Sequence, residues 1–81
     1  MRLPRDVSGA RLVKALGRLG YHVTRQTGSH LRLTRSGEGG EHHLTVPNHD
    51  PLKLGTLNNI LRDVAGHTGL ARDELLERLF G

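Results

Sequence analysis

The spacing of hydrophobic residues changes period twice along this chain, and no other feature restricts its fold as strongly. Apolar residues recur at helical spacing between Ser8 and Leu19, and they alternate with polar residues from Tyr21 to Val46. Helical spacing returns from about Lys53. The chain therefore reads as a helix, then strands, then further helices, and 81 residues suit a single domain.

The first helix is predicted over Ser8–Leu19. Ser8 is a good N-cap residue, because its hydroxyl can accept a hydrogen bond from a backbone N–H of the first turn. Leu12, Leu16 and Leu19 make one apolar stripe, and Gly20 supplies the stop. The same helix carries a basic stripe of Arg11, Lys14 and Arg18. That stripe is either a surface for phosphates or an ordinary solvated helix face.

Three strands are predicted next, over Tyr21–Gln26, His30–Arg35 and His42–Val46. Thr27–Ser29 reads as a short turn, and the Gly-rich segment Ser36–Glu41 reads as a flexible loop. Because side chains alternate along a strand, one face of the sheet receives the apolar residues and is expected to face the core. These core-facing residues are Tyr21, Val23, Leu31, Leu33, Leu44 and Val46, and His30, His43 and Thr45 share the other face.

The segment Pro47–Pro51 breaks the third strand, because proline cannot donate to a sheet ladder. A helix follows from Lys53 to Gly66, and its predicted apolar face is Leu54, Leu57, Ile60, Leu61 and Val64. A short last helix spans Asp73–Phe80. The predicted fold class is α+β: an α-β-β-β-α order plus a short C-terminal helix, with a three-stranded antiparallel sheet that the helices cover on one face.

The charge balance favours a polyanionic partner. Twelve Lys and Arg against eight Asp and Glu give a net charge of +4, and ten of the twelve cations are Arg. Tyr21 and Phe80 are the only aromatic residues of the Phe, Tyr and Trp class, so a surface that binds single strands by base stacking is excluded. Without cysteine, disulfides and thiol catalysis are excluded. No apolar run could span a bilayer, and we expect a cytoplasmic protein.

His30 is the leading candidate for chemistry. It begins a strand directly after the turn that Gly28 and Ser29 form, and Arg32 on its own strand and Arg25 on the paired strand bring cations to it. An imidazole among guanidinium groups could act as an acid or base on a phosphodiester. The alternative is that His30 is an exposed strand residue without chemistry.

The remaining candidates are less specific. His42 and His43 face opposite sides of a strand, which is poor geometry for one metal, and we expect no metal site. His49 could contact a substrate or bond a backbone carbonyl. Lys53 lies near a helix start, where unpaired amides favour a phosphate. His67 is expected just after a helix end, where it would complement the dipole.

The chain resembles the HicA family of toxin mRNA interferases, the toxins of HicAB toxin–antitoxin modules, and the likeness covers nearly all of residues 1–81. The segment Arg25-Gln26-Thr27-Gly28-Ser29-His30 is the strongest signature. One difference is at Leu54, where members often carry Lys, whereas here the Lys is Lys53. The other matching segments are Leu19-Gly20-Tyr21, Leu44-Thr45-Val46-Pro47-Asn48-His49, Gly55-Thr56-Leu57 and Ile60-Leu61.

This resemblance implies one toxin domain over residues 1–81 with a fold like a double-stranded-RNA-binding domain. It implies a metal-independent endoribonuclease that cleaves mRNA, needs no cofactor and uses His30 as its catalytic residue. It further implies a HicB-like antitoxin that covers the catalytic His, and we expect the toxin alone to be a monomer. The RNA-contacting candidates are Arg25, Ser29, Arg32, His49 and Lys53. The alternative function is a non-catalytic module that binds double-stranded RNA by its shape.

Overall fold

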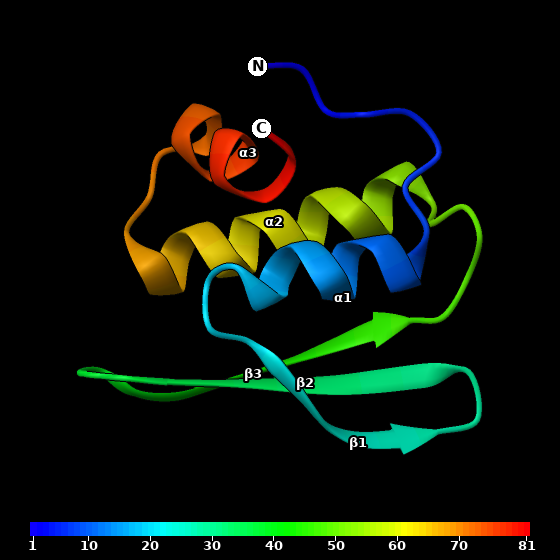
Figure 1. Cartoon of the computed structure of the whole chain (residues 1–81), viewed down its shortest axis with the longest axis horizontal. Coiled ribbons are helices and arrows are strands. Elements are labelled where there is room, and N and C mark those ends of the chain that lie inside the picture. The colour runs from blue at the N-terminus through cyan, green and yellow to red at the C-terminus, as the bar shows by residue number, and fades with distance from the viewer.

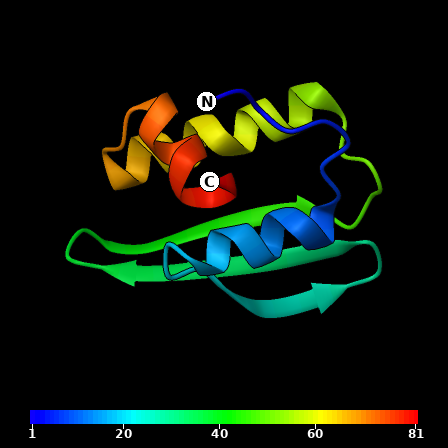
Figure 2. The same cartoon turned by 45° about the horizontal axis from the view of Figure 1, so that its top comes forward.

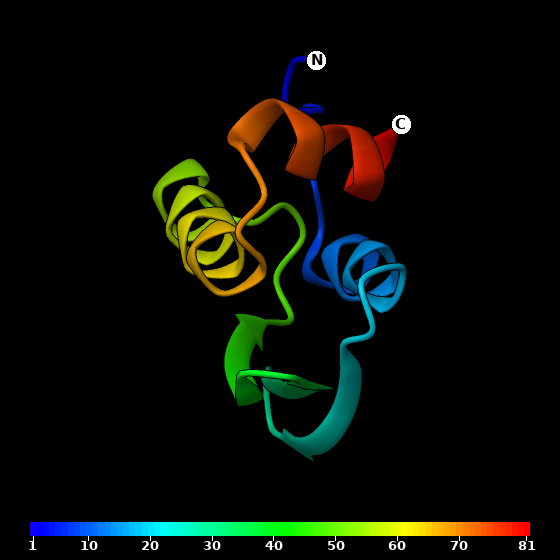
Figure 3. The ribbon, with the colours of Figure 1, turned by 90° about the vertical axis from the view of Figure 1, so that its left-hand side faces the viewer.

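Helices and strands occupy separate layers in the computed structural model, which describes residues 1–81 (Figure 1). The order confirms the predicted α+β class, and the sheet has strand order β1-β2-β3 with both pairs antiparallel. Figure 3 shows α1 and α2 on one face of the sheet and α3 over those two helices. None of the helices has the length and apolar character that a membrane crossing requires. The elements are α1 (Gly9–Gly17), β1 (His22–Thr27), β2 (His30–Gly37), β3 (Gly40–Pro47), α2 (Leu54–Thr68) and α3 (Arg72–Phe80).

Both ends of α1 are capped as the sequence indicates, although the helix is shorter than predicted. The Ser8 hydroxyl accepts a hydrogen bond from the backbone N–H of Arg11 at 3.0 Å. The α-helix ends at Gly17 rather than at Leu19, because the following residues tighten into a turn. Gly20 (φ 93°) closes that turn: its N–H donates to the carbonyl of Gly17, and the Tyr21 N–H donates to Leu16.

The two hairpins differ in how well the sequence predicts them. The first turn is where it was expected, with Gly28 at φ 53° and Thr27 paired with His30, which suits a two-residue hairpin. The second prediction is wrong. Instead of a flexible loop over Ser36–Glu41, the strands continue until Gly37 pairs with Gly40. Gly40 (φ 99°) adopts the backbone angle that lets so short a turn close.

The core lies between the inner face of the sheet and the helices. Two predicted members are exposed instead: Leu54 at 64% and Val23 at 43%. Leu54 is the first residue of α2 and faces solvent, while Val23 borders an irregularity in the outer strand β1, between Val23 and Arg25. The buried side chains include Leu12 and Leu16 of α1, Leu31, Leu33, Leu44 and Val46 of the sheet, Leu57, Ile60, Leu61 and Val64 of α2, and Leu75, Leu76 and Leu79 of α3.

The predicted end of α2 is also wrong. The helix passes through Gly66 and ends at Thr68, because Gly69 takes the left-handed conformation (φ 75°) and its N–H donates to the carbonyl of Ala65. His67 consequently lies in the last turn of the helix and not beyond it. The following helix α3 starts one residue earlier than expected, at Arg72.

The start of α1 packs against the chain that leaves β3. Gly9 is buried, its N–H donates to the carbonyl of His49 at 2.8 Å, and a Cβ at this position would collide with the carbonyl oxygen of Pro47. A glycine is therefore required here by close backbone approach. Figure 2 shows the resulting arrangement, with the start of α1 and the end of β3 side by side.

A hydrogen-bonded cluster joins the sheet to α2 at the other end of β3. The Tyr21 hydroxyl lies 2.7 Å from Nδ1 of His42, and Nε2 of His42 lies 3.2 Å from Oδ1 of Asp63. Because a carboxylate only accepts, Nε2 of His42 donates to Asp63, and the Tyr21 hydroxyl bonds the other ring nitrogen. The His67 ring stacks on His42, with centroids 4.3 Å apart and planes 11° apart.

This cluster shifts the proton affinity of two of its members. Desolvation lowers the pKa of His67 below 6.5, the positive charges of His42 and Arg35 lower it further, and Asp63 partly opposes them. Its Nε2 atom is buried without a hydrogen-bond partner. Burial raises the pKa of Tyr21 above 10.0, with Arg35 lowering it and Asp63 raising it. The cluster therefore favours a neutral His67 and a protonated Tyr21.

Two glycines of α1 provide a matched pair of substitutions. Gly9→Ala should lower the free energy of unfolding by about 1–3 kcal/mol, because the new methyl group overpacks against backbone. Gly17→Ala should raise it by up to about 1 kcal/mol, since that position opens to empty space and alanine favours helix. Urea denaturation measures both. Equal effects of the two variants would contradict the close approach at Gly9.

The stability of the fold should fall as the pH drops below about 6.5. The unfolded chain binds a proton at His67 with a pKa near 6.5, whereas the folded chain binds it only at lower pH. Protonation therefore favours unfolding, and the loss develops between 6.5 and the folded pKa. Urea denaturation across this range should show a weaker pH dependence for His67→Asn, while His22→Asn, an exposed control, should retain that of the wild type. Identical slopes for His67→Asn and the wild type would contradict the assignment.

Candidate functional site

His30 is the first residue of β2 and lies on the open face of the sheet, the face that no helix covers. It pairs with Thr27 across one neighbouring strand and with Pro47 across the other. Its own side chain is exposed, whereas the next residue, Leu31, is buried on the inner face. The burial of Leu31 therefore forces His30 outward, as the alternation in the sequence predicts.

Two arginines stand beside His30 on the same face. Arg25 of β1 pairs directly with Arg32 of β2, and Thr45 of β3 completes this row. Arg32 is two residues from His30 along one strand, and Arg25 is its diagonal neighbour across the pair. Such neighbours lie about 7–8 Å apart between Cα atoms, within reach of a long side chain. The structure thus brings together His30, Arg25 and Arg32 as predicted.

The backbone around His30 is tied to two other parts of the fold. The carbonyl of Ser29 accepts a hydrogen bond from the N–H of Asn48 at 2.6 Å, and the carbonyl of the next residue, His49, accepts from Gly9. The residue before His30 is thereby joined through the end of β3 to the start of α1. This chain of backbone bonds fixes the position of the β1–β2 turn.

The other two candidates, His49 and Lys53, lie at the same end of the molecule as His30. Their side chains do not join the group that His30 forms with the two arginines. The His49 side chain is exposed and bonds no backbone carbonyl, so the alternative in which it serves such a carbonyl is wrong. Lys53 is the N-cap residue of α2 and makes no side-chain cap. No hydrogen bond or ion pair connects either side chain to His30. Their contact with a ligand stays a prediction.

The side chains of all six candidate residues are exposed and have no hydrogen-bond or ion-pair partner within the protein. None of them takes part in a side-chain hydrogen bond or an ion pair. Unpaired cations on a surface are available to an external anion without first breaking an internal contact. The residues in question are Arg25, Ser29, His30, Arg32, His49 and Lys53.

A second polar group on the open face was missed by the sequence reasoning. Thr34 is 4% exposed, and its hydroxyl lies 3.0 Å from both the Thr24 hydroxyl and Nδ1 of His43. Nε2 of His43 lies 3.8 Å from a Glu41 carboxylate oxygen. Period-two alternation places these residues on one face, but their hydrogen bonds depend on the strand register. His43 is therefore held within the fold, whereas His30 is not.

The imidazoles of His42 and His43 point to opposite faces, as their adjacency predicts. His42 meets Tyr21 and Asp63 on the helix side, and His43 meets Thr34 on the open side. The chain contains no group of three His, Cys, Asp or Glu side chains placed to hold a metal ion.

Comparison with known protein families identifies the family of this chain. The model of the HicA toxin of bacterial toxin–antitoxin systems matches residues 9–65, from the first residue of α1 into the last turns of α2. This match includes the whole sheet and the segment from Arg25 to His30, but not α3. No curated protein and no solved structure shows significant similarity. The match spans well over half of the 81 residues, and the chain belongs to the HicA toxin family of bacterial toxin–antitoxin systems.

Proposed function

We propose that this toxin is an endoribonuclease that cleaves mRNA with His30 as its catalytic residue, and that residues 1–81 form one toxin domain. The observation that carries the proposal is the row of unpaired groups on the open sheet face, with His30 directly beside Arg25 and Arg32. An imidazole can act as the base in phosphodiester cleavage, and two cations can stabilise the negative charge that builds up on the phosphate. Membership of the HicA family supports the same assignment.

The reaction follows from the chemistry of RNA itself. His30 takes the proton from a ribose 2′-hydroxyl, and that oxygen attacks the adjacent phosphorus. The bond from phosphorus to the 5′ oxygen breaks, and the leaving oxygen receives a proton from solvent water, since the site is open to solvent. The cleaved strand then ends in a cyclic phosphate. A well-placed base of this kind contributes roughly 10²–10⁴-fold to the rate.

Arg25 and Arg32 supply the electrostatic part of this mechanism. Negative charge builds up on the phosphate oxygens as the 2′ oxygen attacks, and guanidinium groups stabilise it. Because neither arginine has a carboxylate partner, their full charge is available to the phosphate. The mechanism needs no metal ion or cofactor, so chelators should not affect it.

The partners follow from the same surface. A HicB-like antitoxin that presents carboxylates to Arg25, His30 and Arg32 would exclude RNA by occupying its site. Ser29, His49 and Lys53 are proposed to contact RNA at the edge of this surface, where they are exposed. The isolated toxin is proposed to be a monomer, since the leucines of α3 are already buried against the rest of the chain.

A non-catalytic module that binds double-stranded RNA is the second candidate. The basic surface without stacking aromatics favours it as much as it favours an enzyme, since A-form RNA is recognised by shape, phosphates and 2′-hydroxyls. Substitution of His30 distinguishes the two functions, because a binding module would still bind RNA without this residue and would release no cleavage products.

His30→Ala should abolish cleavage of mRNA and relieve growth arrest when the toxin is expressed in bacteria, because the proton acceptor is lost. His22→Ala is the matched control, since His22 is exposed on the same face and pairs with Thr34, four residues along β2 from His30. RNA products are followed on gels with and without EDTA. Equal toxicity of His30→Ala and the wild type, with both folded, would overturn the catalytic assignment.

Arg32→Gln should lower kcat/KM for RNA cleavage by about 10²-fold, since one charge that stabilises the transition state is removed. The slope of log binding constant against log salt concentration should also decrease by about 1. Arg62→Gln removes the same charge from an exposed position of α2 and should change neither quantity. Equal losses in the two variants would show that only net charge matters.

A further inference from the structure

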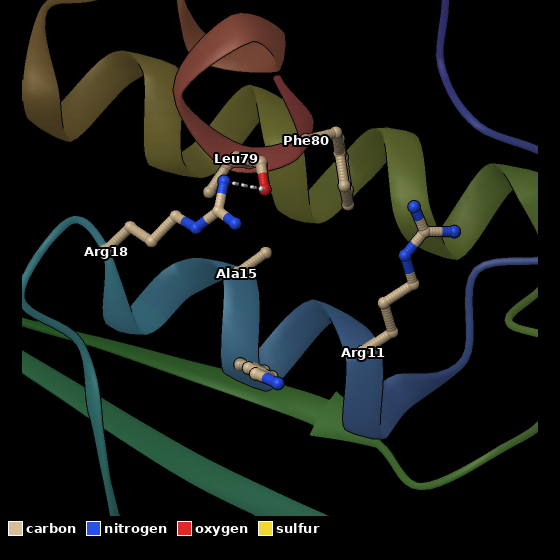
Figure 4. Close-up of a pocket in the computed structure, with 6 residues that line it drawn as sticks. Arg11, Ala15, Arg18, Leu79 and Phe80 are labelled. Carbon is tan, nitrogen blue, oxygen red and sulfur yellow. Dashed lines mark hydrogen bonds between the residues drawn. The ribbon is translucent and has the colours of Figure 1, made fainter.

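A basic groove lies in the helical layer, separate from the open sheet face. Its volume is about 260 Å³, and it runs between α1 and α3 (Figure 4). Two cations of α1 and its C-cap residue Arg18 line it at i, i+3 and i+7, so they follow one side of the helix over about 10 Å. The lining residues are Arg11, Lys14, Ala15, Arg18, Leu79 and Phe80, and none of them is acidic.

The charge of this groove is not neutralised by the protein. None of its three cations forms an ion pair. Arg18 donates from Nη1 to the carbonyl of Leu79 at 3.3 Å, so it caps the end of α3. Arg11 places its guanidinium 5.5 Å from the centroid of the Phe80 ring. Lys14 has no partner at all, and both Arg11 and Lys14 are exposed.

We propose that this groove binds the phosphate backbone of RNA, as a second contact separate from the catalytic face. The proposal rests on the endoribonuclease function proposed above and extends it. Protein-binding surfaces usually have an apolar or aromatic centre, whereas nucleic-acid interfaces are polar and strongly positive. Here Ala15 and Leu79 are buried, and Phe80 is half-buried beneath Arg11. The groove therefore presents the exposed cations Arg11 and Lys14 above a largely buried apolar floor, which suits a polyphosphate chain.

The groove is also connected to the catalytic end of the molecule. Arg11 lies two residues after Gly9, whose N–H bonds the carbonyl of His49, and the preceding Asn48 bonds the carbonyl of Ser29. The basic stripe thus begins next to the segment that precedes His30 and leads away from it. The groove therefore begins at the same end of the fold as His30.

The wall of the groove comes from a part of the chain outside the family match. Leu79 and Phe80 belong to α3, which follows the matched residues 9–65. Without α3, the stripe of α1 would be an open helix face. The helix converts that face into a groove, and the contact between Arg18 and the end of α3 holds the two helices together.

The test uses the full chain with His30→Ala, which should bind RNA without cleaving it. Arg11→Gln with Lys14→Gln removes the two exposed cations of the groove, and Arg2→Gln with Arg62→Gln removes two exposed cations elsewhere. Arg18 is left intact because it caps α3. Fluorescence anisotropy of a labelled single-stranded RNA, read between about 50 and 200 mM salt, gives affinity and salt dependence.

The groove variant should bind RNA at least about tenfold more weakly at the lower salt concentration. Its slope of log binding constant against log salt should fall by roughly 1.4, which corresponds to two lost phosphate contacts on a single strand. The control pair should retain the slope of the parent. Lys14→Arg, which keeps the charge, should retain the affinity, and circular dichroism should show the same fold for every variant.

Equal losses in the groove and control pairs, or no loss in either, would overturn the proposal. If the groove variant binds RNA normally but loses binding of polyglutamate, the groove serves an acidic protein segment instead. Failure of the enzyme assignment would look different, because the chain with His30 intact would then leave RNA uncut. Cleavage by the wild type together with parental binding by the groove variant would refute the groove alone.

Discussion

The burial of alternate residues in β2 and β3 is the constraint on which the rest of the structure depends. Leu31 and Leu33 must face the helices, because the small core has no other source of apolar surface on this strand. Their neighbours His30 and Arg32 are then forced onto the open face, with Arg25 opposite Arg32. The hydrophobic core and the candidate active site are therefore two sides of one strand, and a shift of register by one residue would destroy both.

The alternation of buried and exposed residues also decides which histidines bond within the fold and which are free to meet a substrate. His42 faces the helices, where it bonds Tyr21 and Asp63 and stacks on His67. His43 faces outward but is held by the Thr34 hydroxyl. His30 has no internal partner. Neither ring nitrogen of His30 is engaged within the fold, so both are free to exchange a proton with a substrate.

The sequence predicts features that depend on local residue spacing. It does not predict features that depend on contacts between distant parts of the chain. Period-two alternation identifies His30 and Arg32 because β2 is regular, whereas Arg25 reaches the open face through the register shift between Val23 and Arg25 in β1, which alternation does not predict. The sequence predicts that α2 ends at Gly66, because a glycine inside a helix cannot be told from a terminating glycine by sequence alone. In the structure, Gly69 ends the helix. The stacking of His67 on His42 joins positions 25 residues apart, and no periodicity reports it. The likeness to a double-stranded-RNA-binding domain stays a prediction.

Positive charge is divided between the sheet face and the helical layer, so a ligand that covers one of these surfaces leaves the other open. The sheet face carries the imidazole, and the groove between α1 and α3 carries cations without any acid or base. An antitoxin that covers the sheet face would stop cleavage yet leave the groove open. Inhibition of cleavage and release of RNA would then be separate events, because the proposed phosphate contacts of the groove would persist while the sheet face is covered.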